Sequence, residues 1–171
     1  MSRNIMRKII MDSSSAILLC RCGGIRALLE NSCCIVPPSV RDELTVKGHE
    51  GSEFFDLCFE DGLIRVLDAG NEFNPGISLH KGERDVISLF AAGRGDYIII
   101  DDGRGAAYCR DNMIPYINAL LAVRLLNTCG IKDKDETALL HNRLKEYGRY
   151  SAAVIEWAEM SGADDLKFFL L

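Results

Sequence analysis

The run Tyr97–Ile100, which reads Tyr-Ile-Ile-Ile, constrains the fold more than any other feature of the sequence. A continuous β-prone run of this kind is typical of a strand in a parallel sheet that is covered on both faces. Shorter candidate strands occupy residues 7–11, 34–36, 63–67 and 114–117, and helical segments separate them. Alternating strands and helices with short connections predict βαβ units with right-handed crossovers. We therefore expect an α/β fold, a three-layer α/β/α sandwich around a central, mostly parallel sheet of about five short strands.

Helix-capping residues, helix breakers and apolar residues at helical spacing predict where the helices lie. The expected ranges are 16–20, 25–30, 39–46, 51–60, 83–92, 105–111, 118–127, 133–147 and 151–160. Pro38 suits the first turn of the helix expected at 39–46. Residues 70–80 contain Pro75, Gly76 and two asparagines without periodicity, so we expect a loop there.

The chain has the size and composition of a single globular domain, which we expect to span residues 1–171. Of its 171 residues, 48% are hydrophobic and 26% are charged. A chain of this length typically buries roughly 70% of its unfolded surface, so it can form a core without disulfides or a structural metal. Its apolar runs are far shorter than the roughly 20 residues that span a bilayer. Asp12 interrupts the apolar stretch after Arg3, Arg7 and Lys8, which breaks any signal-peptide pattern. We therefore expect a cytoplasmic protein with no membrane segment.

The seven cysteines raise the question of a metal cluster. Cys20-Arg21-Cys22 and Cys33-Cys34 hold four thiols that in principle suit a tetrahedral zinc ion. Neither pair has the usual two-residue spacer, and no histidine is nearby. Most of the cysteines lie in apolar segments, which favours reduced, partly buried thiols without disulfides.

The charge balance limits the ways in which this chain can bind nucleic acid. With 20 Lys and Arg against 25 Asp and Glu, the formal net charge is -5. That sign is wrong for a protein that holds nucleic acid by counterion release alone. Either the partner is not a polyanion, or some of the acids gather at a site where divalent cations offset their charge.

Acidic residues follow two of the predicted strands or lie on the helices near them. Parallel sheets bind ligands outside the carboxyl ends of their strands, so these acids are the first candidates for a site. They are Asp12, Glu43, Glu83, Asp85, Asp101 and Asp102. Carboxylates that converge without basic partners repel one another, and a hard cation such as Mg²⁺ or Mn²⁺ offsets that repulsion. Taken singly, each acid is explained as well or better as a helix cap or an exposed helix residue, whereas their joint placement favours a site.

Four segments resemble the PIN domain in their residues, order and spacing. They read DSSSAIL at 12–18, VPPSVRDEL at 36–44, KGERDVI at 81–87 and IIIDDG at 98–103. More narrowly, the chain is similar to prokaryotic PIN proteins related to the nuclease toxins of toxin–antitoxin pairs. The resemblance implies a metal-dependent nuclease, usually acting on RNA, that uses Mg²⁺ or Mn²⁺. It places Asp12, Glu43, Glu83 and Asp102 in the positions of the acidic quartet.

The sequence departs from the family pattern at Asn118, where relatives often carry an acid or a Gly-Thr pair. Asn118 offers a carbonyl oxygen but no charge, which leaves a second metal site in question. Successive side chains of a strand point to opposite faces, so Asp101 and Asp102 are not both expected to bind one ion. The resemblance aligns Asp102 with the metal ligand. Asp101 is then left to stabilise the turn or to accept a hydrogen bond from a backbone N–H.

Further residues are expected to act around the quartet. Ser14 lies at a helix start and can donate to a carboxylate or a phosphate, and Asp85 is a second acid near Glu83. Arg104 and Arg110 can contact the nucleic-acid backbone, although isolated arginines are more often simply solvated. The segment 70–81 is a candidate border of the substrate groove. Expected partners are an RNA substrate, an antitoxin-like protein and a second copy of the chain.

Two other hypotheses for the function of the chain remain open. One is a PIN-fold nucleic-acid-binding or protein-interaction module with little activity, which the net charge and Asn118 favour. The other is an unrelated Mg²⁺-binding phosphoryl-transfer or receiver-like domain, although neither its expected acid two residues after Asp12 nor its expected lysine after the last strand is present. The apolar tail 166–171 is expected to pack on the domain or on a second copy.

Overall fold

The computed structural model describes residues 6–70 and 73–171, so Arg3 lies outside the described residues. The strands within them are β1 (Lys8–Met11), β2 (Cys33–Val36), β3 (Ile64–Val66), β4 (Tyr97–Ile99) and β5 (Tyr116–Ile117). They form one sheet in the order β3-β2-β1-β4-β5, and all of its pairings are parallel. The expected α/β class with a central parallel sheet is confirmed.

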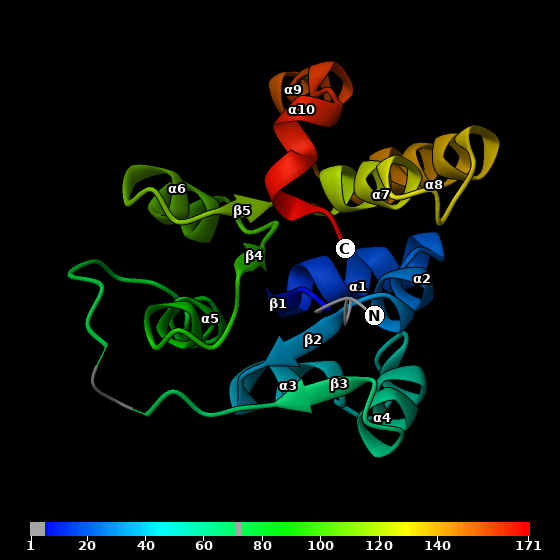
Figure 1. The fold of residues 1–171 in the computed structure, drawn as a ribbon. Coiled ribbons are helices and arrows are strands. Elements are labelled where there is room, and N and C mark those ends of the chain that lie inside the picture. The colour runs from blue at the N-terminus through cyan, green and yellow to red at the C-terminus, as the bar shows by residue number, and fades with distance from the viewer. Residues whose placement is uncertain (1–5, 71–72) are drawn as a thin grey trace, which may run out of the picture.

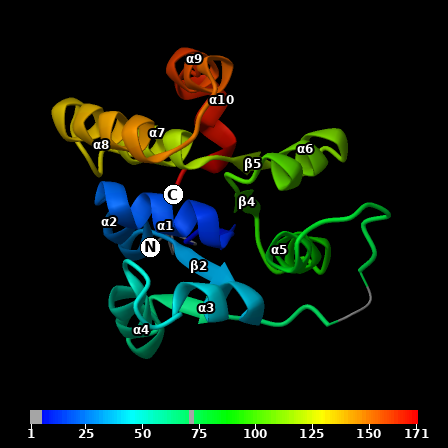
Figure 2. The same ribbon diagram turned by 180° about the vertical axis from the view of Figure 1, so that it is seen from behind.

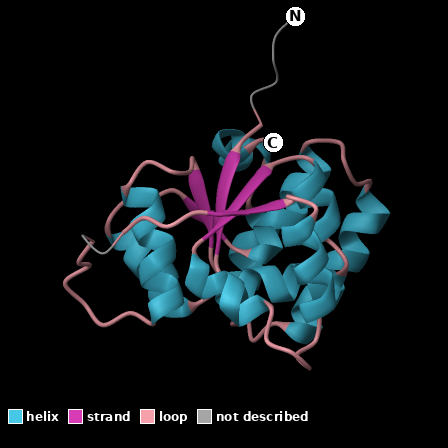
Figure 3. Ribbon diagram, turned by 90° about the horizontal axis from the view of Figure 1, so that it is seen from below, coloured by secondary structure: helices cyan, strands magenta, loops and turns pink. Residues whose placement is uncertain are grey.

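Helices cover both faces of this sheet. They are α1 (Ser13–Cys22), α2 (Ile25–Glu30), α3 (Pro38–Leu44), α4 (Ser52–Glu60), α5 (Lys81–Ala91), α6 (Gly103–Asp111), α7 (Ala119–Thr128), α8 (Lys134–Tyr147), α9 (Ala152–Met160) and α10 (Ala163–Leu166), followed by the 3-10 turn η1 (Lys167–Phe169). Helices α5 and α6 lie on one side of the sheet, and α1, α2, α7 and α8 lie on the other (Figure 1). Figure 3 shows the strands enclosed between these two layers.

The centre of the sheet is closed to water on both faces. Ile9 and Ile10 of β1 and Ile98 of β4 have no exposed surface. Burying an isoleucine side chain contributes about 1.5–3 kcal/mol to stability, so these strands hold the two layers together. Because a strand that is covered on both sides needs no polar face, it appears in the sequence as an unbroken apolar run.

Several boundaries differ from the predicted ones for identifiable reasons. The first helix begins at Ser13 rather than at residue 16, because Asp12 is its N-cap and accepts a hydrogen bond from the Ser15 N–H at 2.8 Å. The helix expected at 39–46 begins at Pro38 and ends at Leu44. The strand expected at 114–117 is limited to β5; Pro115 has no N–H to donate to the ladder. The sequence did not predict α10 or η1.

The C-terminal tail packs against the amino ends of β1 and β4. Of the two expected arrangements, packing on the domain or on a second copy, the structure shows the first. The Tyr97 hydroxyl donates to the Phe169 carbonyl at 3.1 Å, and the two rings meet edge to face with centroids 4.9 Å apart. The Arg7 guanidinium lies over the Phe168 ring and donates to the Phe168 carbonyl at 2.6 Å. The tail therefore covers the end of the sheet opposite the acidic residues.

No helix within residues 6–70 and 73–171 combines the length and the apolar character that crossing a membrane requires. The cysteines are free thiols, either buried or half-buried. Burial raises the pKa of the Cys22 thiol to about 11 and that of Cys34 to about 12, so both remain protonated near neutral pH.

Candidate active site

The backbone brings the ends of three strands to one level of the sheet. Met11 pairs with Ile99, and Ile99 pairs with Ile117. The Asp12 N–H donates to the Ile99 carbonyl at 3.1 Å, and the Ile100 N–H donates to the Ile117 carbonyl at 2.9 Å. The residues that follow β1, β4 and β5 therefore share one edge, which we call the carboxyl edge. It includes Asp12, Asp101, Asp102 and Asn118.

Asp12 is the most deeply buried acid of the carboxyl edge, with 4% of its surface exposed. Burial first, and the negative charge of Asp101 second, raise the pKa of its carboxyl from 3.8 to about 7. Hydrogen bonds from Ser15 and from the Asp102 backbone oppose this rise. The protein therefore holds a carboxyl group here whose ionisation it disfavours.

Asp101 follows β4, the strand paired with β1 before Asp12, and both of its carboxylate oxygens accept hydrogen bonds. The Tyr150 hydroxyl donates to Oδ1 at 2.5 Å, and the Ala119 N–H donates to Oδ2 at 2.9 Å. Burial raises the pKa of Asp101 while these donors lower it. The expected hydrogen bond between Asp101 and a backbone N–H is present, and it ties β4 to the start of α7.

Glu83 and Asp102 form the second close pair of acids. Asp102 is the N-cap of α6, and its Oδ1 accepts from the Arg104 N–H at 2.8 Å and the Gly105 N–H at 3.2 Å. Glu83 is buried in the first turn of α5 and accepts from the His80 N–H at 3.2 Å. Burial raises the pKa of Glu83, and so does the adjacent Asp102 carboxyl. The two carboxyls are thus crowded in the same way as Asp12 and Asp101.

Glu43 connects the two pairs from the end of α3. The Ser13 hydroxyl, next to Asp12, donates to Glu43 Oε2. On the other side, a Cβ atom added to Gly82 would lie 3.2 Å from Glu43 Oε1, so the carboxyl rests against the residue preceding Glu83. Glu43 is therefore linked to the neighbour of Asp12 on one side and to the neighbour of Glu83 on the other.

The other expected site residues have more varied positions. Asn118 is buried and is the N-cap of α7, where its side chain accepts from the Leu121 N–H at 3.0 Å. Ser14 is exposed. Its neighbour Ser13, which sequence reasoning missed, makes the hydrogen bond to a carboxylate instead. Because α1 starts immediately after Asp12, the three serines point in directions about 100° apart.

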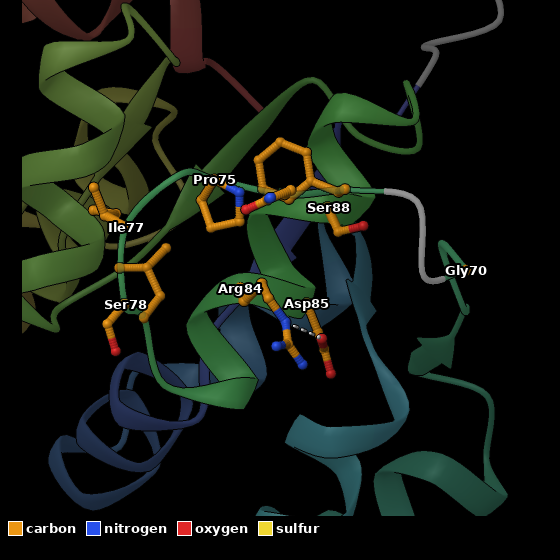
Figure 4. A pocket seen from close by; sticks show the side chains of 10 residues that line it. Gly70, Pro75, Ile77, Ser78, Arg84, Asp85 and Ser88 are labelled. Atoms are coloured by element: carbon orange, nitrogen blue, oxygen red, sulfur yellow. Dashed lines mark ion pairs between the residues drawn. The ribbon is translucent and has the colours of Figure 1, made fainter.

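Asp85 links α5 to α3 rather than to the other acids. It accepts a hydrogen bond from the Ser39 hydroxyl at 2.7 Å and forms an ion pair with Arg84 at 3.6 Å. Both members of this ion pair border a cavity of about 490 Å³ (Figure 4). The described part of the 70–80 segment forms the opposite wall with Pro75 and Ile77, and this connection arcs along the outer side of α5 (Figure 2). Residues 71–72 lie outside the described part.

The two candidate RNA-binding arginines are both exposed on α6. Arg104 follows Asp102 in the first turn of the helix, close to the carboxyl edge. Arg110 lies in the last turn and forms an ion pair with Asp111 at 3.0 Å. Arg104 is therefore the better placed of the two to contact a substrate at this edge.

The carboxyl edge fits a hard cation by its chemistry, although it does not form a complete ligand group. Within the part of the chain that the structure describes, no three His, Cys, Asp or Glu side chains gather as a metal-holding group. The donors present are oxygens, and the acids lie in crowded pairs. Among the described residues, no Lys or Arg side chain forms an ion pair with Asp12, Glu83 or Asp101. A divalent cation would supply the positive charge that these pairs lack.

Comparison with known proteins identifies the family. A family model described as the PIN domain matches residues 8–158, which includes the whole sheet and every residue of the carboxyl edge. Neither the curated proteins nor the solved structures contain a match to the chain. The family match also rules out the receiver-like and phosphoryl-transfer alternatives. The chain belongs to the PIN-domain family, whose fold is of the nuclease type.

Proposed function

We propose that this protein is a divalent-metal-dependent ribonuclease that hydrolyses phosphodiester bonds at its carboxyl edge. The observation that supports this most strongly is the crowding of Asp12 with Asp101 and of Glu83 with Asp102 in a chain of the PIN-domain family. Burying acids in like-charged pairs costs stability, and a site that must hold a cation gives a reason for that cost.

In this proposal Asp12, Glu83 and Asp102 hold Mg²⁺ or Mn²⁺, and Glu43 lies beside them. When bound, the ion lowers the pKa of a water molecule and offsets charge on the phosphate that is attacked. Asp12 and Asp102 are oriented by backbone N–H groups at the starts of α1 and α6. Each therefore has one carboxylate oxygen held in place by the start of a helix.

Two further residues act beside the proposed metal ligands. Ser13 donates to Glu43 and fixes its carboxyl next to the start of α1. Arg104 extends from the first turn of α6 and supplies a positive charge for the RNA backbone. The protein thus needs no overall positive charge, since the cation and one arginine provide the local attraction.

The test is cleavage of a long, unstructured RNA with Mg²⁺ or Mn²⁺, with EDTA as the control. We expect cleavage by the wild-type protein and none by Asp12→Asn or Asp102→Asn. Asp56→Asn is the matched control because it removes the same charge from an exposed position on α4. Cleavage that persists in Asp12→Asn, or in EDTA, would remove the nuclease proposal. RNA binding without cleavage in any divalent ion would support the low-activity module instead.

Metal binding is measured separately by thermal unfolding. Either divalent ion should raise the melting temperature, because a ligand that binds only the folded state stabilises it. Sodium at equal ionic strength should not. The absence of any divalent-specific shift in the wild-type protein would contradict the proposed metal site.

The resemblance of four sequence segments to PIN nuclease toxins motivates a further element of the proposal, namely that a partner protein holds the ribonuclease inactive. Expression of the wild-type chain alone should arrest cell growth, and Asp102→Asn should relieve the arrest. Growth that is unaffected by an active wild-type enzyme would argue against the toxin role while leaving the ribonuclease activity intact.

A further inference from the structure

We propose that Tyr150 is a positioning residue of the active site, which holds Asp101 and through it fixes Asp12 for metal binding. This inference rests on the proposed metal-dependent function. Tyr150 lies in the connection between α8 and α9, outside the elements that supply the acids.

The contact between Tyr150 and Asp101 joins a distant part of the chain to the carboxyl edge. The Tyr150 hydroxyl donates to Asp101 Oδ1 at 2.5 Å, and the Ala119 N–H donates to Oδ2 at 2.9 Å. With a donor on each oxygen, the Asp101 carboxyl is restricted in rotation about its last bond. Charge-assisted O–H bonds of this length are among the stronger hydrogen bonds in proteins.

Asp101 in turn is coupled to Asp12. Asp12 follows β1 and Asp101 follows β4, the last residues of these strands (Met11 and Ile99) pair, and the Asp12 N–H donates to the Ile99 carbonyl at 3.1 Å. The Ser15 N–H donates to Asp12 Oδ1 at 2.8 Å, and the Ser15 hydroxyl is buried without a hydrogen-bond partner among the described residues. A displacement of Asp101 would therefore disturb the neighbouring Asp12 at the shared end of β1 and β4.

The local chain is shaped to keep the Tyr150 ring in this position. Gly148 has an ordinary backbone conformation, with φ -85° and ψ 149°, so its conformation does not require glycine. The lack of space for a side chain does require glycine here, because a Cβ atom would lie 2.2 Å from Tyr150 Cε2 and 2.9 Å from the Leu144 carbonyl oxygen. The ring thus folds back over Gly148, which directs its hydroxyl toward the carboxyl edge.

The primary test is Tyr150→Phe, which removes the hydroxyl and keeps the ring. Tyr147→Phe is the matched control, because Tyr147 lies three residues earlier with its ring against Arg21 and away from the acids. Two quantities are measured for each variant: the Mn²⁺ concentration that gives half of the maximal thermal shift, and the Mg²⁺ concentration that gives half of the maximal cleavage rate.

We expect Tyr150→Phe to raise both metal concentrations by about tenfold or more, as loss of a residue that orients a metal ligand does. Cleavage at saturating Mg²⁺ should recover most of the wild-type rate, and Tyr147→Phe should leave both concentrations unchanged. In an Asp101→Asn background, adding Tyr150→Phe should have little additional effect. Gly148→Ala should raise the metal requirement in the same direction, since it displaces the ring without removing the hydroxyl.

A purely structural role for Tyr150 would lower the melting temperature of the metal-free protein without changing either metal concentration, and that result would overturn the inference. Equal behaviour of Tyr150→Phe and Tyr147→Phe would do the same. If the wild-type protein shows neither a divalent-specific thermal shift nor cleavage, the proposed function itself fails and the inference falls with it. The wild-type measurements thus separate the two failures.

Discussion

Replacing Asp12 by asparagine should stabilise the metal-free protein while it abolishes cleavage. Asp12 is buried, and its pKa is raised to about 7 by burial first and by the charge of Asp101 second. Asparagine keeps an oxygen that can accept from the Ser15 N–H and is as good an N-cap as aspartate. The substitution therefore removes an unfavourable buried charge without removing the helix cap.

The size of the effect follows from the pKa. A rise from 3.8 to about 7 corresponds to about 4 kcal/mol of unfavourable free energy for the ionised carboxylate, at about 1.4 kcal/mol per pKa unit. Part of the gain from removing this charge is lost, because a negative charge at the N-terminus of α1 stabilises the helix by about 0.3–1 kcal/mol. Imperfect hydrogen bonding of the new amide reduces it further, and we expect a net gain of about 1–3 kcal/mol. For a chain of this size that is a rise of about 2–12 °C in melting temperature.

The sign of the pH dependence is a second test. Because the folded-state pKa lies above the unfolded one, folded Asp12 keeps its proton between about pH 4 and 7 while the unfolded chain releases it. Wild-type stability therefore falls as pH rises through this window and levels off above it. The advantage of Asp12→Asn should be largest at pH 8 and less than about half as large at pH 5.

Thermal or urea unfolding in EDTA at pH 5 and pH 8 measures these differences, with the exposed Asp56→Asn as the control for loss of one negative charge. A melting temperature of Asp12→Asn at or below the wild-type value at pH 8 would refute the reasoning. An advantage of equal size at both pH values would show that the gain does not come from the ionisation of Asp12.

Three further predictions concern the surroundings of the site. At saturating Mg²⁺, Asp102→Asn should lose at least about a hundredfold in cleavage rate, whereas Asp101→Asn should lower the melting temperature more than the rate; the reverse outcome would exchange the two roles. Gly105→Ala should destabilise the protein by about 1–3 kcal/mol in urea unfolding, because its Cβ would lie 2.3 Å from Ile100 Cδ1; an unchanged unfolding midpoint would contradict this close contact. Truncation after Ala163 should lower the melting temperature, since it removes the packing of the tail on β1 and β4, and an unchanged melting curve would show that the tail adds nothing to stability.

The sheet and its acidic edge could be predicted because their signals are local. An apolar run followed by acids indicates both a buried parallel strand and the end at which ligands bind, and this holds for Asp12 and for Asp101 and Asp102. Helix starts were harder to place, since Asp12 is at once the last residue before α1 and its cap. Glu43 and Glu83 follow no strand end; they were candidates only as acids on neighbouring helices, and the resemblance to the PIN domain placed them in the quartet.

The contacts between these residues could not be predicted from the sequence. Three serines in a row give no periodic signal, so only the phase of α1 decides that Ser13 meets Glu43, Ser14 faces solvent and Ser15 is buried. Tyr150 lies far along the chain from Asp101, in a connection whose sequence indicates only a break between helices. Such contacts depend on how α8 and the α8–α9 connection pack on the sheet, which is a property of the whole fold.

The strand order also has a consequence for when activity can arise during synthesis. β1 lies between β2 and β4 in the sheet. Because β4 is synthesised much later than β1, one edge of β1 stays unpaired until then. The first half of the chain can pair β1 with β2 and β2 with β3, but Glu83 and Asp102 have not yet been made. At about 5–20 residues per second, a ribosome needs roughly 5–20 seconds to proceed from Asp12 to Asp102, and more to reach Tyr150. If the protein is a ribonuclease, its nascent chain is therefore harmless to the messenger that encodes it until most of the domain has been made.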